Sequence, residues 1–320
     1  MSPTSEISIK KNEVTRLSNL KTRIYKDRQY LILLLPVICY FLLFHYVPMF
    51  GIMIAFKDFS YAKGIFGSPW AKMNGFANFI RFFKYVDFWI LIRNTVLINF
   101  YSLIFSFPVP IILAILLYEC KLRHYKKVIQ TISYMPHFIS VVIIVGMLAV
   151  MLSPRNGIVN IVLSTFGLNP IYFMAEAGWF RPLYVSSGIW QDAGFGAIIY
   201  LAALTSVNAE LYEAANIDGA TRIQRIWHIS IPGITPTIVI LFILTFGRLM
   251  NVGFEKAWLM QNGPNLEVSE IIATYIYKVG LLQGDFAYST TIGLFNNVIN
   301  LILVVIVNNI CKRVAAISLW

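Results

Sequence analysis

Residues 210 to 236, ELYEAANIDGATRIQRIWHISIPGITP, form a charged, alanine-dotted stretch between two long apolar runs. Glu213 and Asp218 place two carboxylates near a turn, and Ala214 and Ala215 keep the neighbouring surface small enough for another protein to approach closely. A carboxylate that is desolvated in such a contact must meet a cation, because removing one partner of a buried ion pair costs about 3–5 kcal/mol. The stretch therefore predicts a docking knob with Glu213 as its anchor.

The same stretch carries the signals of two short helices separated by a sharp turn. Asn208 is expected to cap the first helix, with Glu210 at its positive end, where a negative charge is favoured. Gly219 is expected to end that helix, because glycine adopts the left-handed conformation at little cost. Thr221 and Gln224 have the spacing of a capping box and predict the start of the second helix. A loop that only joined two helices would not need this set of residues.

The elements that must hold this knob are membrane spans. The chain has 320 residues, of which 58% are hydrophobic and 13% charged, and its mean hydropathy is +0.69, which is more apolar surface than one soluble core can bury. A spanning helix needs about 20 mostly apolar residues. Six stretches qualify and predict an all-α membrane protein with six transmembrane helices: about 30–56, 94–118, 132–152, 183–206, 231–251 and 287–311.

The basic residues predict the orientation, because Lys and Arg concentrate in cytoplasmic segments. These residues are concentrated in the segment before the first span and in the loop around 119–131. This distribution predicts a six-helix membrane domain at 29–311, with a basic tail at 1–28 and a second tail at 312–320 in the cytoplasm. The knob at 207–231 is then also cytoplasmic. The basic loop at 57–93 runs against this rule. The net charge of +11 then needs no nucleic acid as a partner, and the three cysteines and four histidines show no metal-ligand spacing.

No G-x-x-x-x-G-K-[ST] loop is present, so the chain is not expected to hydrolyse ATP or to be an enzyme. Two other classes remain as alternatives. A secondary transporter or channel would need coupling carboxylates near the middle of the membrane or paired broken helices, and Asp192 is the one weak candidate. A membrane-embedded enzyme would need a zinc, nucleophile or acidic-pair motif, and none is visible.

The string EAANIDGA, followed after eleven residues by Pro232, resembles the EAA signature of permease subunits in binding-protein-dependent ABC importers. The matching positions are Glu213, Ala214, Ala215, Asp218, Gly219, Ala220, Ile229 and Pro232. Further segments resemble carbohydrate-uptake permeases, above all the branch that imports pectin and alginate fragments: GFANFIRFF, YMPHFIS, IWQDAGFGAIIYLAAL, DFAYSTTIGLFNNVINLILV and the closing SLW.

This resemblance implies a type I importer fold in the bacterial plasma membrane, with the stretch at 207–231 as the coupling helix. It implies as partners a homologous second permease that completes a heterodimer, a cytoplasmic ATPase dimer, an external solute-binding protein and an oligosaccharide, which could be acidic. ATP and Mg²⁺ would be bound by the ATPase and no cofactor by this chain. A permease of the same class for another solute is the closest alternative.

Polar residues inside spans are costly and mark candidate substrate contacts. Aromatic rings would stack on sugar rings and amides would bond hydroxyls, which gives a candidate path of Trp190, Gln191, Asp192, Arg248, Asn251, Trp258 and Asn297. Arg248 would attract the carboxylates of a uronate sugar. The alternative for the charged residues is an ion pair between Asp192 and Arg248 that pins two helices together.

Overall fold

The computed structural model describes residues 26–315 and 318, and within them it is helical with no strand. Most of the expected tail at 1–28 and part of the tail at 312–320 lie outside these residues. The main helices are α2 (Arg28–Phe41), α3 (Val47–Met49), α4 (Gly64–Gly67), α5 (Ala77–Phe83), α6 (Phe88–Ser106), α7 (Pro108–Glu119), α8 (Arg123–Tyr134), α9 (Val141–Met151), α10 (Ile158–Thr165), α11 (Ala177–Thr205), α12 (Ala209–Ile217), α13 (Arg222–Arg225), α14 (Ile231–Phe246), α15 (Phe254–Met260), α16 (Leu266–Ser269), α17 (Ile272–Tyr277) and α18 (Phe286–Ala315).

Four helical runs of the described chain are long and apolar enough to cross a membrane, and the number rises to six if two bent pairs each count as one span. The four runs are Arg28–Phe56, Phe88–Glu119, Arg222–Phe246 and Phe286–Val314. The bent pairs are Arg123–Phe138 with Val141–Met151, and Ala177–Thr205 with Ala209–Ile217. The all-α prediction is confirmed, and the six predicted stretches fall on these six segments.

The third predicted span, 132–152, is not a straight helix. The run Arg123–Phe138 ends in a 3-10 turn over Met135–Phe138 that contains Pro136, and the chain then bends by 100° before α9 begins. The Ser140 side chain then caps α9 by accepting a hydrogen bond from the Ile143 N–H group. Proline and a new cap explain the break, because proline cannot continue the hydrogen bonding of the helix before it.

The fifth predicted span, 231–251, is shifted toward the amino end. Helical structure runs continuously from Arg222, through a π turn at Ile226–Ser230, to Phe246. Pro232 lies in the first turn of α14, directly after the π turn and inside this continuous helical run. The residues from Gly247 to Gly253 are outside the helix, which removes Arg248 and Asn251 from the span.

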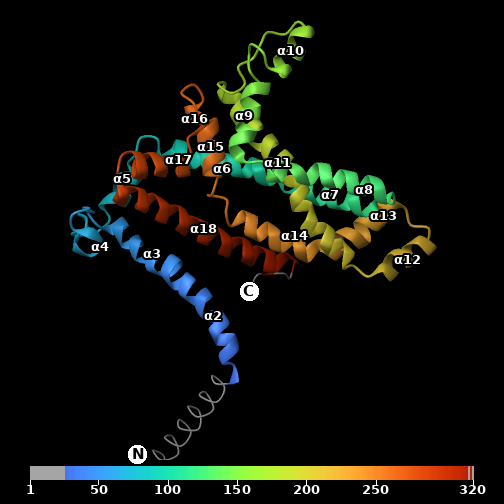
Figure 1. Ribbon diagram of the computed structural model, residues 1–320, viewed down its shortest axis with the longest axis horizontal. Helices are drawn as coiled ribbons and strands as arrows, with labels where there is room; N and C mark the ends of the chain where they lie inside the picture. The colour runs from blue at the N-terminus through green and yellow to red at the C-terminus, as the bar shows by residue number, and fades with distance from the viewer. Residues whose placement is uncertain (1–25, 316–317, 319–320) are drawn as a thin grey trace, which may run out of the picture.

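Helices α6, α7, α11, α14 and α18 form the body of the molecule, with α12 and α13 at one end and α4 and α5 at the other (Figure 1). Three apolar clusters hold this body together. Ala114, Tyr200 and Ile234 mark the cluster where α7, α11 and α14 meet. A second cluster joins α11 to α15, and a third joins α5, α6, α17 and α18. The end that carries α12 is thus built on the same packed helices that run through the body.

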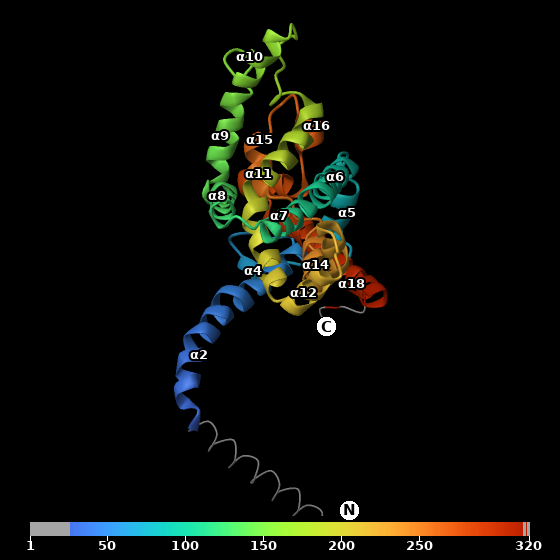
Figure 2. The same cartoon turned by 90° about the vertical axis from the view of Figure 1, so that its right-hand side faces the viewer.

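The first span stands apart from this body (Figure 2). No residue of α2 is buried, and none of its most apolar window is covered by the rest of the described chain. The 3-10 turn at Phe50–Phe56, where Ala55 is fully buried, is the point at which the chain joins the bundle. An apolar helix that finds no partner in its own chain must be covered by lipid or by another protein.

Candidate functional site

The acidic knob has the local structure that its sequence predicts. The Asn208 side-chain oxygen accepts a hydrogen bond from the Glu210 N–H group at 3.0 Å and caps α12. The helix ends before Asp218, and Gly219 follows in the left-handed conformation with φ of +74°. The Thr221 N–H group donates to the Gln224 side chain at 2.7 Å, and the capping box of α13 is complete. The helix, turn and helix are therefore confirmed.

The surface of this knob is open. No residue of α12 is buried. The side chains of Glu213 and Asp218 make no ion pair within the described part of the chain, and Ala214 is exposed while Ala215 and Ala220 are partly covered. Beside them, Ile217 is 87% exposed. The knob thus presents two unpaired carboxylates and an apolar side chain to whatever lies beyond the end of the bundle.

Behind this open surface, the segment is anchored to the bundle. The Arg225 guanidinium lies 3.4 Å from the Glu119 carboxylate at the end of α7, and it also bonds the Asn216 side chain in α12. The Tyr212 hydroxyl and the buried Ser230 hydroxyl share a hydrogen bond of 3.0 Å. These contacts join α12, α13 and α7, so α12 is attached to the end of a transmembrane helix.

The anchoring also involves the ring of Tyr118, which lies 5.6 Å from the ring of Tyr212. His228 has its Nδ1 atom 2.9 Å from the Gln224 carbonyl oxygen. It therefore bonds the preceding turn of its own helix.

A cavity of about 730 Å³ lies between α6, α7, α11, α14 and α15. Its wall is mostly apolar, and its polar groups come chiefly from one face of α11 and from the start of α15. The lining includes the polar or charged side chains of Tyr184, Gln191, Asp192, Glu255 and Lys256. A space of this size in a helical bundle, with a few converging polar groups, is typical of a ligand site.

Of the residues predicted to form a substrate path, Gln191 and Asp192 line this cavity. The Gln191 side chain also donates to the Ile139 carbonyl at 3.1 Å. The Asp192 carboxylate lies 3.0 Å from His137 Nδ1, and the His137 ring stacks on Phe195 with 4.0 Å between the centroids.

The expected ion pair between Asp192 and Arg248 is therefore wrong, since Asp192 is paired with His137. Arg248 follows the end of α14, is exposed, and does not line the cavity. The sequence interpretation failed because it extended the fifth span over five residues that are not helical.

The other path candidates lie outside the cavity lining. Trp190 is exposed on a different face of α11, and Asn297 is exposed on α18. The Trp258 ring packs 4.8 Å from Tyr277. The Asn251 side-chain oxygen accepts hydrogen bonds from two amides of α18, which come from Asn296 at 2.8 Å and Asn300 at 3.1 Å.

Sequence reasoning missed Lys256, which is 8% exposed. Its Nζ atom donates to the Tyr184 carbonyl oxygen at 2.8 Å and lies 4.8 Å from the centre of the Tyr184 ring. Burial lowers the pKa of Lys256 to about 8, and the nearby Asp192 carboxylate acts in the opposite direction. The available signal was a charged pair, Glu255 and Lys256, in an otherwise apolar run just after a span.

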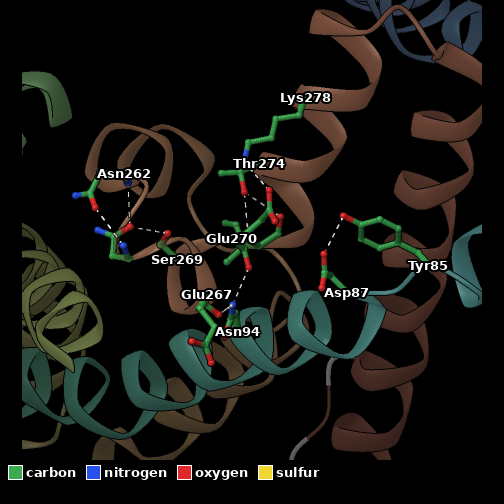
Figure 3. Close-up of polar contacts among 11 residues, drawn as sticks. Tyr85, Asp87, Asn94, Asn262, Glu267, Ser269, Glu270, Thr274 and Lys278 are labelled. Atoms are coloured by element: carbon green, nitrogen blue, oxygen red, sulfur yellow. Dashed lines mark hydrogen bonds and ion pairs between the residues drawn. The ribbon is translucent and has the colours of Figure 1, made fainter. Parts of the chain in front are cut away.

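The segment that follows α15 is fixed by a clamp on α6 (Figure 3). The buried Asn94 amide donates to the Glu267 carbonyl at 2.8 Å and to the Glu270 carbonyl at 3.0 Å. The Ile272 N–H group donates to the hydroxyl of Thr95 at 3.1 Å, and Lys278 pairs with Glu270 at 2.5 Å. The loop from α15 to α17 is thus held to the body by hydrogen bonds from a transmembrane helix.

Comparisons with known proteins agree with this architecture. Residues 30–316 match the family model described as "Binding-protein-dependent transport system inner membrane component". The chain is 44% identical over 294 residues to the polygalacturonan/rhamnogalacturonan transport system permease protein YteP of Bacillus subtilis (strain 168), which covers 92% of this chain and 91% of that protein.

Two solved structures are also similar. One is a bacterial ABC transporter involved in the import of the acidic polysaccharide alginate, with a TM-score of 0.86, 42% identity, and coverage of 92% of this chain and 99% of that chain. The other is a bacterial alginate ABC transporter in complex with an alginate pentasaccharide-bound periplasmic protein, with a TM-score of 0.85, 40% identity, and coverage of 93% and 99%.

Proposed function

The chain belongs to the family of binding-protein-dependent transport system inner membrane components, and we propose that it is one membrane subunit of an ABC importer for acidic oligosaccharides. The family places it among multi-pass membrane permeases. The observation that carries the importer mechanism is the open acidic helix α12 at the end of the bundle, anchored through Arg225 to Glu119. ATP-driven closure of a separate ATPase would move α12 and, through it, the helices around the cavity.

The residues assigned to ATPase coupling are Glu213, Ala214, Ala215, Asp218, Gly219, Ala220 and Pro232. The unpaired Glu213 carboxylate would meet a cation in the partner's cleft, and the exposed Ile217 would bury its apolar surface there. In this proposal ATP and Mg²⁺ are bound by the ATPase dimer. The chain itself supplies the substrate path and the helix α12 that contacts the ATPase.

The substrate class is supported by the relatives and by the cavity. The printed names of the relatives refer to polygalacturonan, rhamnogalacturonan and alginate. The cavity of about 730 Å³ has room for a few sugar rings, and its polar lining can bond hydroxyls through Gln191, Asp192 and Glu255. An external solute-binding protein would deliver the oligosaccharide, as the complex with a periplasmic protein suggests.

A second, homologous permease is the proposed partner within the membrane. The isolated first span supports this assignment, because α2 makes no buried contact with its own bundle and offers a continuous apolar surface. We place both termini and α12 on the cytoplasmic side, in agreement with the basic residues of the amino-terminal segment and of the last turn of α18, Lys312 and Arg313.

The test uses the complete complex with Glu213→Gln, and Glu210→Gln as a matched control that removes a carboxylate from the same helix. We expect Glu213→Gln to lower sugar uptake and co-purification with the ATPase by about tenfold or more, because it leaves the partner's cation unpaired. Glu210→Gln should retain both within about threefold, since Glu210 accepts a hydrogen bond from the Asn208 amide within its own segment. Equal, unchanged uptake in both variants would refute the proposed coupling.

A further inference from the structure

Lys256 is a buried cation at the wall of the cavity. It lies on α15, is 8% exposed, and points its ammonium group toward the face of α11 that carries Tyr184 and Gly188. A Cβ atom built on Gly188 would lie 3.4 Å from Nζ, so the ammonium approaches the helix backbone closely. Tyr184, Gly188 and Lys256 all line the cavity.

The ammonium group has unused hydrogen-bonding capacity. A protonated lysine has three N–H donors, and the contact with the Tyr184 carbonyl uses one of them. No carboxylate lies within 4.0 Å of Nζ among residues 26–315. A buried charge with no counter-ion in contact is costly.

Burial lowers the pKa of Lys256 to about 8. At neutral pH the group is still mostly protonated, because the pH lies below this value. An anion that entered the cavity would stabilise the ammonium and return the pKa toward its ordinary range. The wall therefore holds a cation whose charge an incoming anion would compensate.

The other charged residues of the cavity are Asp192 and Glu255. Asp192 is bonded to His137 at 3.0 Å, and Glu255 is exposed at the start of α15. Both are acceptors, and with Gln191 they suit the hydroxyl groups of a sugar ring. Lys256 is the one cation of this lining, so a sugar carboxylate would be attracted to it and repelled by Asp192 and Glu255, which can accept hydrogen bonds from hydroxyls.

We propose that the Lys256 ammonium binds a carboxylate of the oligosaccharide in the cavity and so determines selectivity for acidic over neutral sugars. This inference rests on the proposed function and assigns to Lys256 the role that the sequence suggested for Arg248. The charged contact is formed and released as the sugar passes, while the bond to the Tyr184 carbonyl keeps the ammonium in position.

A purely structural role for Lys256 makes a different prediction. If the side chain only pins α15 to α11, its loss should impair acidic and neutral sugars alike. Lys256→Gln keeps a donor for the Tyr184 carbonyl and removes the charge, whereas Lys256→Arg keeps the charge. Arg248→Gln is the matched control, because it removes a cation that is exposed and outside the cavity lining.

The experiment measures uptake by the reconstituted complex of a trigalacturonate and of the same trisaccharide with its carboxylates reduced to alcohols. We expect Lys256→Gln to lower uptake of the acidic sugar by about tenfold or more, the usual effect of losing a charged hydrogen bond, while the reduced sugar changes by less than about threefold. Lys256→Arg and Arg248→Gln should keep the wild-type preference.

An equal loss for both sugars, or no loss for the acidic one, would overturn the inference and leave the proposed function standing. If the wild-type complex takes up neither sugar, the proposed function itself fails and the assignment of Lys256 fails with it. If the Lys256→Gln complex does not assemble, the test is the preference of the Lys256→Arg complex for acidic over neutral sugar. Loss of that preference while the charge is kept would contradict a site that selects by charge.

Discussion

Breaking the contact between Arg225 and Glu119 should separate the docking segment, residues 207–231, from the bundle. Arg225 lies on α13 and Glu119 ends α7, so their contact joins two elements that are 106 residues apart in the chain. Arg225→Gln and Glu119→Gln each remove one charge with little change in size. The expected result is that the ATPase still hydrolyses ATP, while the energy no longer reaches the cavity.

The magnitude follows from the distance and from the burial of the pair. At 3.4 Å and an effective dielectric constant of about 20, two unit charges attract by roughly 5 kcal/mol. Their side chains are 14% and 16% exposed, so desolvation offsets most of this attraction, and a net value of about 1–3 kcal/mol remains. A contact of that strength corresponds to a change of roughly 5- to 150-fold in an equilibrium.

The assay is a double-mutant cycle on the reconstituted complex, with uptake and ATP hydrolysis measured together. Each single variant should lower the number of sugars imported per ATP by about tenfold, and the double variant should be no worse than either single one. Arg123→Gln is the control, because it removes an exposed cation at the start of α8, outside the docking segment.

Two results would refute the reasoning. If the effects of the two substitutions simply multiply, the residues do not act as a pair. If ATP hydrolysis falls in parallel with uptake, the substitutions disturb docking of the ATPase and not transmission from it.

Three further outcomes are expected. Gly219→Ala should destabilise the folded conformation of the docking segment by about 1 kcal/mol, because Gly219 has φ of +74° with open space around it. The measurement is ATPase binding by the purified complex, which should be reduced. Gly146→Ala is the neutral comparison, because a Cβ at Gly146 would meet nothing within 4 Å. Gly194→Ala should lower thermal stability by about 1–3 kcal/mol or prevent assembly, since a Cβ there would collide with the backbone of Ser133 in α8; an unchanged melting temperature would contradict this close packing. Uptake of acidic sugar should fall as the pH rises through about 8, because the pKa of Lys256 is lowered to about 8 and the ammonium loses its proton above that value; Lys256→Arg should be insensitive over the same range, because arginine stays protonated.

The docking segment could be predicted from sequence because its structure is local. The cap of α12 joins residues two apart, and the capping box of α13 joins residues three apart. Gly219 needs only its own backbone freedom. Such interactions are encoded by residue type at short spacing and depend little on the rest of the fold.

The cavity could not be predicted in the same way, because its residues meet through long-range packing. Asp192 and His137 are 55 residues apart, and Lys256 reaches a carbonyl 72 residues away. Helix α14 ends a few residues earlier than the sequence predicts, so Arg248 and Asn251 lie outside the span. Asn94 shows the same limit, since its partners Glu267 and Glu270 lie 173 and 176 residues further along the chain.

The packing around α11 indicates which wall of the cavity is rigid and which can move. Gly194 lets α11 meet the α8 backbone directly, and a Cβ on Gly196 would lie 3.2 Å from Pro110 of α7. The first contact is with backbone and the second with the rigid ring of a proline, so neither neighbour yields easily, and α7, α8 and α11 are expected to move as one body when α12 is displaced.

The opposite wall is built differently. α14 and α15 are joined by the non-helical residues 247–253, and the bond from Lys256 to the Tyr184 carbonyl ties α15 back to α11. Non-helical residues absorb changes in backbone angles more readily than a packed helix does. The bond from Lys256 and the apolar cluster shared by α11 and α15 keep α15 with this body, so a change in cavity width is expected where the carboxyl-terminal part of α14 meets it, with residues 247–253 as the joint.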